Sequence, residues 1–224
     1  AECDAAALSL LQSAFPKVRF TAAGTFTPTE LVAQKIQVTA SLGDLAAVYE
    51  PVDGAWLSVD GSAAEGHRRS AGGDGPLIGV TWYPSATALG GLEVIQPLLD
   101  VPGVRWLMLP TGPVRPELAR ALAALDGPVV FDPTVLQGGL PALAAKLSAV
   151  DLLIATDDLG PAVAGALGRS TWKIAEQAGH WSWLVEGTTS KWHPQTRIFR
   201  SPGDGMLRTE LERFMASLPR RESR

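Results

Sequence analysis

The distribution of apolar residues divides the chain into an irregular first part and a regular second part. After Pro76, short apolar runs alternate with segments whose apolar residues recur at helical spacing. Strands that alternate with helices of this kind favour βαβ units. We therefore predict an α/β fold, a Rossmann-like parallel sheet with helices on both faces. The predicted strands are 77–82, 104–109, 129–131, 151–155 and 170–174, and the predicted helices are 90–99, 116–125, 141–150 and 161–167.

The segments before Pro76 and after residue 203 carry weaker patterns. Residues 4–14 have helical spacing behind Asp4, and residues 17–20 alternate as a short strand would. A further helix is expected over residues 28–42, and an amphipathic helix over residues 204–217. Residues 60–76 (DGSAAEGHRRSAGGDGP) are rich in Gly, Ser and charge and contain no bulky apolar residue. They predict a linker, in which His67 is a solvated loop histidine.

Composition excludes several classes of function. Apolar residues make up 46% and charged residues 19% of the 224 residues, as in globular proteins. With a net charge of −4, the chain lacks the excess of basic residues that is typical of nucleic-acid binders. No nucleic-acid partner is therefore expected. No apolar run approaches the roughly 18 residues that a membrane span needs. One cysteine, Cys3, forms no internal disulfide, and we expect a cytoplasmic protein. The chain begins without Met, which suggests further sequence upstream.

Candidate chemistry lies at the predicted strand ends, because open α/β sheets bind ligands beyond the carboxyl ends of their strands. Three such ends are 82–85, 109–112 and 156–160. The third leads directly into a helix, whose first amide groups and dipole suit an anion. The alternative is that Asp157 or Asp158 caps this helix and competes for the same amides. The turn is therefore either a ligand site or a tight connection.

Other motifs point to neither a cofactor nor a metal. The chain lacks a Gly-x-Gly-x-x-Gly or P-loop pattern, and His180 and His193 have no carboxylate or cysteine at ligand spacing. The sequence contains no Gly-x-Ser-x-Gly. Tryptophans cluster near the C-terminus, at positions 172, 181, 183 and 192. They indicate core packing, or alternatively a surface that stacks bases or sugars.

Three segments between residues 150 and 200 resemble a known group. DLLIATDDLGPAVAGALGRSTWKI, GHWSWL and SKWHPQTRIFR are similar to the C-terminal half of GT-B glycosyltransferases. The similarity is to bacterial O-linked N-acetylglucosamine transferase-like proteins that follow tetratricopeptide repeats, and to heptosyltransferases. In that group the segments read roughly D-T-x-x-x-H-L-A-G-A-L-G, P-x-W, D-W-R-W-L and W-Y-P-x-x-R-L-F-R.

The resemblance implies a domain organisation for nearly the whole chain. Residues 1–59 would be the tail of an N-terminal α/β domain, and 60–76 the linker. Residues 77–203 would be a Rossmann-like nucleotide-sugar domain, and 204–224 a C-terminal helix and tail. Such enzymes transfer a sugar from a nucleotide donor to a protein or glycan acceptor. The resemblance thus implies a nucleotide sugar as ligand and a protein as acceptor or partner.

The chain departs from the family pattern where a charged donor is handled. Asp158 stands at the family's Thr and Ala162 at its His, the loop 83–91 has no basic residue, and Gly-Leu-Pro-Ala-Leu replaces a polar stretch before residue 144. Two hypotheses follow: an active glycosyltransferase, or an inactive relative that serves as a binding or scaffold module. The resemblance implies no identifiable catalytic residue here. The candidate donor-binding residues are Trp82, Thr111, Asp157, Asp158, Leu159, Gly160 and Lys173.

Overall fold

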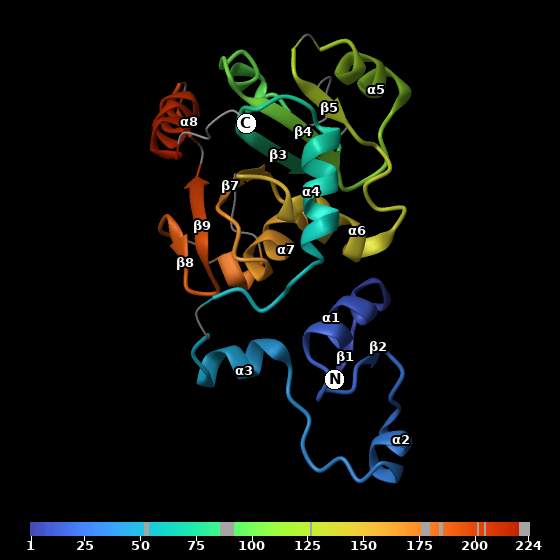
Figure 1. Ribbon diagram of the computed structural model, residues 1–224. Coiled ribbons are helices and arrows are strands. Elements are labelled where there is room, and N and C mark those ends of the chain that lie inside the picture. Colours follow the sequence, from blue (N-terminus) through green and yellow to red (C-terminus); the bar gives the residue numbers. More distant parts are fainter. Residues whose placement is uncertain are drawn as a thin grey trace.

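A seven-stranded sheet forms the centre of the protein (Figure 1). The computed structural model describes residues 1–51, 54–85, 92–125, 127–175, 180–183, 186–200, 202–203 and 205–219. Within them the strand order is β5-β4-β3-β6-β7-β9-β8. Neighbouring strands are parallel, except for the antiparallel edge pair β8 and β9. The strands are β3 (Leu77–Trp82), β4 (Arg105–Pro110), β5 (Val129–Phe131), β6 (Leu152–Ala155), β7 (Thr171–Ala175), β8 (Thr189–Ser190) and β9 (His193–Arg200).

The central strands are continuous apolar runs because both of their faces are covered. Every residue of β3, β4 and β6 is buried. Successive side chains of a strand point to opposite faces, so Thr81 and Trp82 face different layers. Trp82 packs in one hydrophobic layer with Trp106, whereas Leu77 packs in the other.

The strand order defines where a ligand would bind. Counted from β3, the six parallel strands follow the order 3-2-1-4-5-6 of Rossmann folds. The order reverses between β3 and β6, and a crevice beyond the carboxyl ends of these two strands is the usual ligand position. This topology confirms the predicted Rossmann-like α/β fold.

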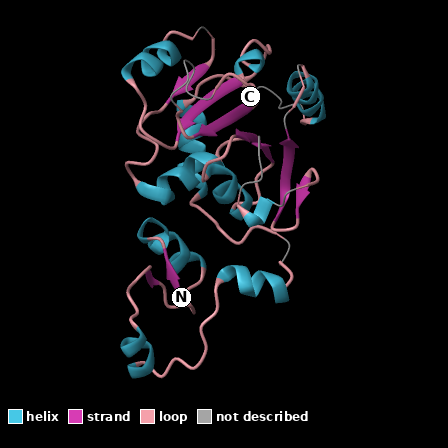
Figure 2. Ribbon diagram, turned by 180° about the vertical axis from the view of Figure 1, so that it is seen from behind, coloured by secondary structure: helices cyan, strands magenta, loops and turns pink. Residues whose placement is uncertain are grey.

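Helices cover both faces of the sheet, as predicted (Figures 1 and 2). One face packs against η2 (Gln96–Leu98), α5 (Pro116–Ala123) and α8 (Met206–Ser217). The other face packs against α6 (Gly139–Ser148) and α7 (Gly160–Ala166). No helix among the described residues is both long and apolar enough to cross a membrane.

The segment predicted as a linker instead contains helix α4 (Gly61–Ser70), which runs beside α6 (Figure 1). Asp60 caps its first turn through the Ser62 amide at 2.8 Å. Arg68 donates to the Ala149 carbonyl at 2.8 Å and to Asp151 Oδ2 at 2.7 Å. The expectation of a loop over residues 61–70 was wrong because polar contacts with the start of β6, and not apolar periodicity, hold this helix.

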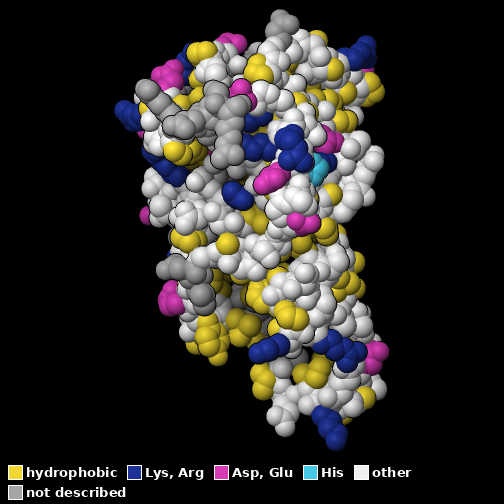
Figure 3. Space-filling view, viewed as in Figure 1, with side chains coloured by type: hydrophobic (Ala, Val, Ile, Leu, Met, Phe, Trp, Pro, Cys, Tyr) yellow, Lys and Arg dark blue, Asp and Glu magenta, His cyan; other side chains and the backbone are white. Residues whose placement is uncertain are grey.

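Residues 1–49 form a smaller unit below the main sheet (Figure 2). Strands β1 (Glu2–Cys3) and β2 (Thr21–Ala22) are parallel and are joined by η1 (Ala5–Ala7) and α1 (Leu8–Ala14). Helices α2 (Pro28–Ala33) and α3 (Leu42–Val48) follow, each with a capping box but without a buried residue. Hydrophobic side chains are visible around α3 in Figure 3, and Leu42 and Val48 are 72% and 77% exposed.

Other local predictions differ from the structure. The strand predicted at 17–20 is absent, and β2 begins at Thr21. Of the helix predicted at 28–42, only α2 (Pro28–Ala33) forms, and α3 begins at Leu42, where the prediction ended. Of the predicted helix 90–99, residues 90 and 91 lie outside the described residues, and the rest contains only the 3₁₀ turn η2. Strands β8 and β9 were not predicted, because polar residues interrupt their apolar pattern.

Candidate functional site

Three strand ends meet at the carboxylate of Asp158, at the switch point of the sheet. Asp158 Oδ1 accepts hydrogen bonds from the Thr81 hydroxyl at 3.2 Å and from the Gly160 amide at 3.0 Å. Asp158 Oδ2 accepts from the Thr111 hydroxyl at 2.8 Å. Thr81 belongs to β3, Thr111 follows β4, and Asp158 follows β6. We call Thr81, Thr111, Asp158 and Gly160 the Asp158 cradle.

Burial of Asp158 raises the pKa of its carboxyl to about 6, despite opposing effects of the three hydrogen bonds and the Lys173 charge. Proton counting supports this direction. The single Thr111 hydroxyl hydrogen has two acceptors, Asp158 Oδ2 and the Trp82 carbonyl at 3.0 Å. If Asp158 is protonated, it donates to Thr111, and Thr111 donates to Trp82. A pKa near 6 suits a general acid or base, but both carboxylate oxygens are already engaged.

Asp158 precedes the helix instead of capping it in the expected position. The N-cap residue of α7 is Leu159, which makes no side-chain cap hydrogen bond. The Asp158 side chain nevertheless accepts from the amide of Gly160, the first residue of the helix. Part of the capping interpretation is therefore confirmed, because the carboxylate accepts the hydrogen bond of an amide that an external anion would need.

Gly160 brings the start of α7 against β3. A Cβ atom at this position would lie 2.0 Å from Thr81 Oγ1 and 2.8 Å from Thr81 Cβ. No side chain larger than the glycine hydrogen can therefore be accommodated here unless Thr81 or the helix start moves. This contact leaves no gap between the helix start and Thr81.

We expect Gly160→Ala to destabilise the protein by about 2–4 kcal/mol, because the added methyl group overpacks a buried contact with a strand. Urea unfolding at pH 7 measures the effect. Gly66→Ala is the matched control, since its Cβ would meet nothing within 4 Å. In the middle of α4 this change should stabilise by about 0.5–1 kcal/mol. Equal stability of the two variants would contradict the close approach of Gly160 to β3.

Lys173 points from β7 toward the same turn. Its ammonium lies 2.7 Å from Asp157 Oδ1 and 3.3 Å from the Thr156 carbonyl oxygen, and the side chain is 1% exposed. Nζ also lies 5.2 Å from the centre of the Trp183 ring. The Lys173 ammonium is thus already paired with the carboxylate of Asp157, whose side chain is 72% exposed.

The structure brings together most of the predicted donor-binding residues, but not Trp82. Thr111, Asp157, Asp158, Leu159, Gly160 and Lys173 lie at or beside the turn after β6. The Trp82 side chain is fully buried in the hydrophobic layer that contains Trp106. Strand alternation directs it away from Thr81 and Asp158, and its part in donor binding stays a prediction. Sequence reasoning missed Thr81, whose only signal was a lone hydroxyl in the apolar run LIGVTW.

The C-terminal tryptophans divide between core and surface. Trp172 is buried with Phe199, their ring centroids 5.3 Å apart. Trp183, on η3 (Trp181–Trp183), stacks on His193 at 4.3 Å. Burial and the charge of His180 lower the pKa of His193 to about 4. Core packing is confirmed for Trp172 and Trp183, whereas Trp181 is 40% exposed.

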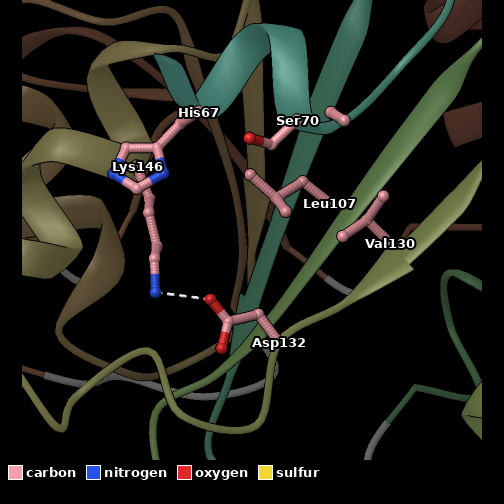
Figure 4. Close-up of a pocket in the computed structure, with 7 residues that line it drawn as sticks. His67, Ser70, Leu107, Val130, Asp132 and Lys146 are labelled. Carbon is pink, nitrogen blue, oxygen red and sulfur yellow. Dashed lines mark ion pairs between the residues drawn. The ribbon is translucent and has the colours of Figure 1, made fainter. Parts of the chain in front are cut away.

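A small hollow lies between α4, α6 and the sheet, and none of the Asp158 cradle residues lines it (Figure 4). Its volume of about 90 Å³ is far below the roughly 300 Å³ at which ligand pockets begin. Lys146 forms an ion pair with Asp132 across it. His67 lies on helix α4, partly buried, and not in a solvated loop. Burial and the Lys146 charge lower the pKa of its imidazole. The residues that line the hollow are His67, Ser70, Ala71, Leu107, Val130, Asp132 and Lys146.

Neither the hollow beside α4 nor the Asp158 cradle resembles a metal centre. Among the described residues, no three His, Cys, Asp or Glu side chains are grouped as metal ligands would be. The loop at 83–91, where the resemblance expects donor contacts, lies outside the described residues beyond Ser85.

Two solved structures are similar to this chain. One is a family 9 glycosyl transferase from Veillonella parvula, with 14% identity and a TM-score of 0.45 over 91% of this chain and 56% of that chain. The other is heptosyltransferase WaaC from E. coli with ADP-2-deoxy-2-fluoro heptose, with 15% identity and a TM-score of 0.45 over 87% of this chain and 58% of that chain. The chain thus spans somewhat more than half of each. No protein-family model and no curated protein matches the chain.

Proposed function

We propose that this chain is the nucleotide-sugar half of a glycosyltransferase-like protein, with its ligand crevice at the switch point of the sheet. The observation that carries the proposal is the convergence of Thr81, Thr111 and the Gly160 amide beyond the ends of β3, β4 and β6. Hydrogen-bond donors from three separate strand ends meet where Rossmann sheets bind their ligands. They enclose an anionic group, which is the chemistry that a diphosphate would offer.

The class of ligand comes from the resemblance of residues 150–200 to GT-B enzymes. On that basis a donor diphosphate would replace the Asp158 carboxylate, beside Asp157, Leu159 and Gly160. Thr111 would then lie near the base or ribose. The acceptor would be a protein or a glycan.

A second candidate function is favoured by the position of Asp158 itself. The carboxylate consumes the donors of the cradle, and the nearby cation Lys173 is already paired with Asp157. A transition state that develops charge on a diphosphate needs such donors and cations free. The alternative is therefore an inactive GT-B relative that serves as a binding or scaffold module.

We also propose that residues 1–59 belong to a further α/β domain. The parallel pair β1 and β2 has only two strands, whereas parallel sheets are normally larger and covered on both faces. Helices α2 and α3 leave large apolar side chains in solvent, which supports a neighbouring layer.

Calorimetry with UDP-, GDP- and ADP-sugars at millimolar concentration tests the proposed function. We compare the wild type with Asp158→Thr, which removes the internal anion and introduces the family residue. We expect the variant to bind at least one nucleotide sugar about tenfold more tightly, the equivalent of about 1.4 kcal/mol. Asp100→Asn is the matched control, because it removes one exposed carboxylate that lies before β4, at the other end of the sheet.

The outcomes separate the two candidates. Binding and turnover by the wild type support a glycosyltransferase. Binding by Asp158→Thr alone supports an inactive relative that retains the shape of the ligand crevice. If neither protein binds any nucleotide sugar while both remain folded, the nucleotide-sugar proposal is wrong.

A further inference from the structure

Two tryptophans meet at the surface beside the edge of the sheet. Trp181 lies on η3 and Trp192 lies between β8 and β9, with ring centroids 5.3 Å apart and ring planes at 84°. The His180 ring lies 5.1 Å from Trp181, and Lys191 Nζ lies 5.1 Å from the centre of the Trp192 ring. We call His180, Trp181, Lys191 and Trp192 the aromatic corner.

A buried serine fixes the corner. The Ser190 hydroxyl donates to the Ser182 carbonyl and accepts from the Trp192 amide at 3.2 Å. Ser190 is 2% exposed. The Ser182 hydroxyl in turn bonds His180 Nδ1 at 2.9 Å. The backbones that carry Trp181 and Trp192 are thus joined, so stacking a ligand on the rings would cost little ordering of the protein.

The corner is connected to the turn that carries the Asp158 cradle. Trp183 belongs to the same 3₁₀ turn as Trp181 but faces inward, onto His193 and Lys173. Lys173 forms the ion pair with Asp157 at 2.7 Å. His193 in turn approaches α7, since a Cβ on Gly165 would lie 2.4 Å from His193 Nδ1. One packed chain of contacts therefore joins the surface tryptophans to the proposed crevice.

The polar groups around the rings indicate the chemistry of an occupant. Lys191 pairs with Glu50 at 3.2 Å, which neutralises the only cation that lies over the corner among the described residues. The planes of the Trp181 and Trp192 rings meet at 84°, so a ligand can stack on the face of one ring and contact the edge of the other. Two parallel rings, which would enclose a planar base, are not formed by this pair. A sugar ring has an apolar C–H face and a rim of hydroxyls. It suits an aromatic face bordered by Lys, Glu and His.

We propose that the aromatic corner is a binding site for neutral carbohydrate, separate from the nucleotide crevice. The site goes beyond the proposed function, because it requires neither a nucleotide nor an empty Asp158 cradle. Its position next to the turn after β6 would hold a glycan close to the crevice.

Titration of the full chain with neutral oligosaccharides tests this site. The probes are chitotetraose, cellotetraose and maltotetraose, followed by tryptophan fluorescence and by the indole N–H signals in NMR spectra. We expect saturable binding of at least one probe in the millimolar range, with shifts of the Trp181 and Trp192 indole signals. Trp181→Ala and Trp192→Ala should each weaken it by about tenfold or more. Trp56→Ala is the matched control, because Trp56 is 45% exposed and packs against another aromatic ring, Phe15, in a tilted arrangement.

The NMR shifts in the wild type keep the test decisive if an alanine variant fails to fold. Saturable binding that shifts other indole signals, or that survives both alanine substitutions, would overturn the proposal. Absence of binding to all three probes would overturn it as well. Nucleotide binding is measured separately with Asp158→Thr, so failure at the corner leaves the result for the crevice unchanged.

Discussion

Replacing Asp158 with Asn is expected to stabilise the protein at pH 7, by up to about 3 kcal/mol. The carboxyl has a pKa of about 6 in the folded protein and 3.8 as a reference value. Because the folded protein holds this proton more tightly than the unfolded chain does, folding is favoured most when Asp158 is protonated. The contribution of this bound proton to the free energy of unfolding is complete below about pH 4 and is lost as the pH rises through about 6.

Asn reproduces the hydrogen bonds of the protonated acid without a charge. Its amide group donates to Thr111, which then donates to the Trp82 carbonyl, and its oxygen accepts from Thr81 and Gly160. The measurement is urea unfolding of both proteins from pH 4 to pH 7.5. The difference between the free energies of unfolding of the two proteins should grow with pH between about 4 and 6 and then level off, because both proteins share all other titrating groups.

Asp100→Asn again serves as the control, because it removes one exposed carboxylate at the other end of the sheet. If Asp158→Asn is instead less stable than the wild type at pH 7, the charge of Asp158 stabilises the fold, and its burial is not the dominant effect.

Removing Asp157 should destabilise the protein through its partner Lys173. Asp157→Ala leaves an ammonium that is 1% exposed and whose remaining partners, within the part of the chain that the structure describes, are the Thr156 carbonyl and the Trp183 ring. Breaking a fully buried pair costs about 3–5 kcal/mol. The Asp157 side chain is 72% exposed, so solvent screens this pair, and we expect a smaller loss of about 1–3 kcal/mol.

Lys173→Met should cost less than about 1 kcal/mol, because a thioether of similar length can pack on Trp183 without a charge. In the Lys173→Met background, Asp157→Ala should then have almost no effect. Urea unfolding of the four proteins in this double-mutant cycle measures the coupling energy. Glu117→Ala, which breaks an exposed pair with Arg120, is the control and should change stability by about 0.5 kcal/mol or less. Equal effects of Asp157→Ala and Glu117→Ala would contradict the structural role of the Asp157–Lys173 pair.

The main sheet was predictable because its strands carry their own signal. Residues 77–82 and 104–109 are apolar runs, and both faces of these strands are covered. Helix α4 and strand β9 were not predictable in the same way. Arg68 holds α4 to Asp151, 83 positions later, and β9 pairs with β7 through backbone groups that no side-chain pattern reports.

The sequence alone determined that strand ends would gather at one edge, and it marked the turn 156–160 as the place to examine. It also showed the departures at Asp158 and Ala162. Only the tertiary structure decided which groups face Asp158. Thr81 and Thr111 lie 77 and 47 positions away, and their approach depends on parallel strand order and on which face each side chain takes. The same alternation turns the Trp82 side chain away from Asp158, into the hydrophobic layer that contains Trp106. The chain therefore holds its own anion at the switch point of the sheet because folding brings two distant hydroxyls and one helix amide to a single carboxylate.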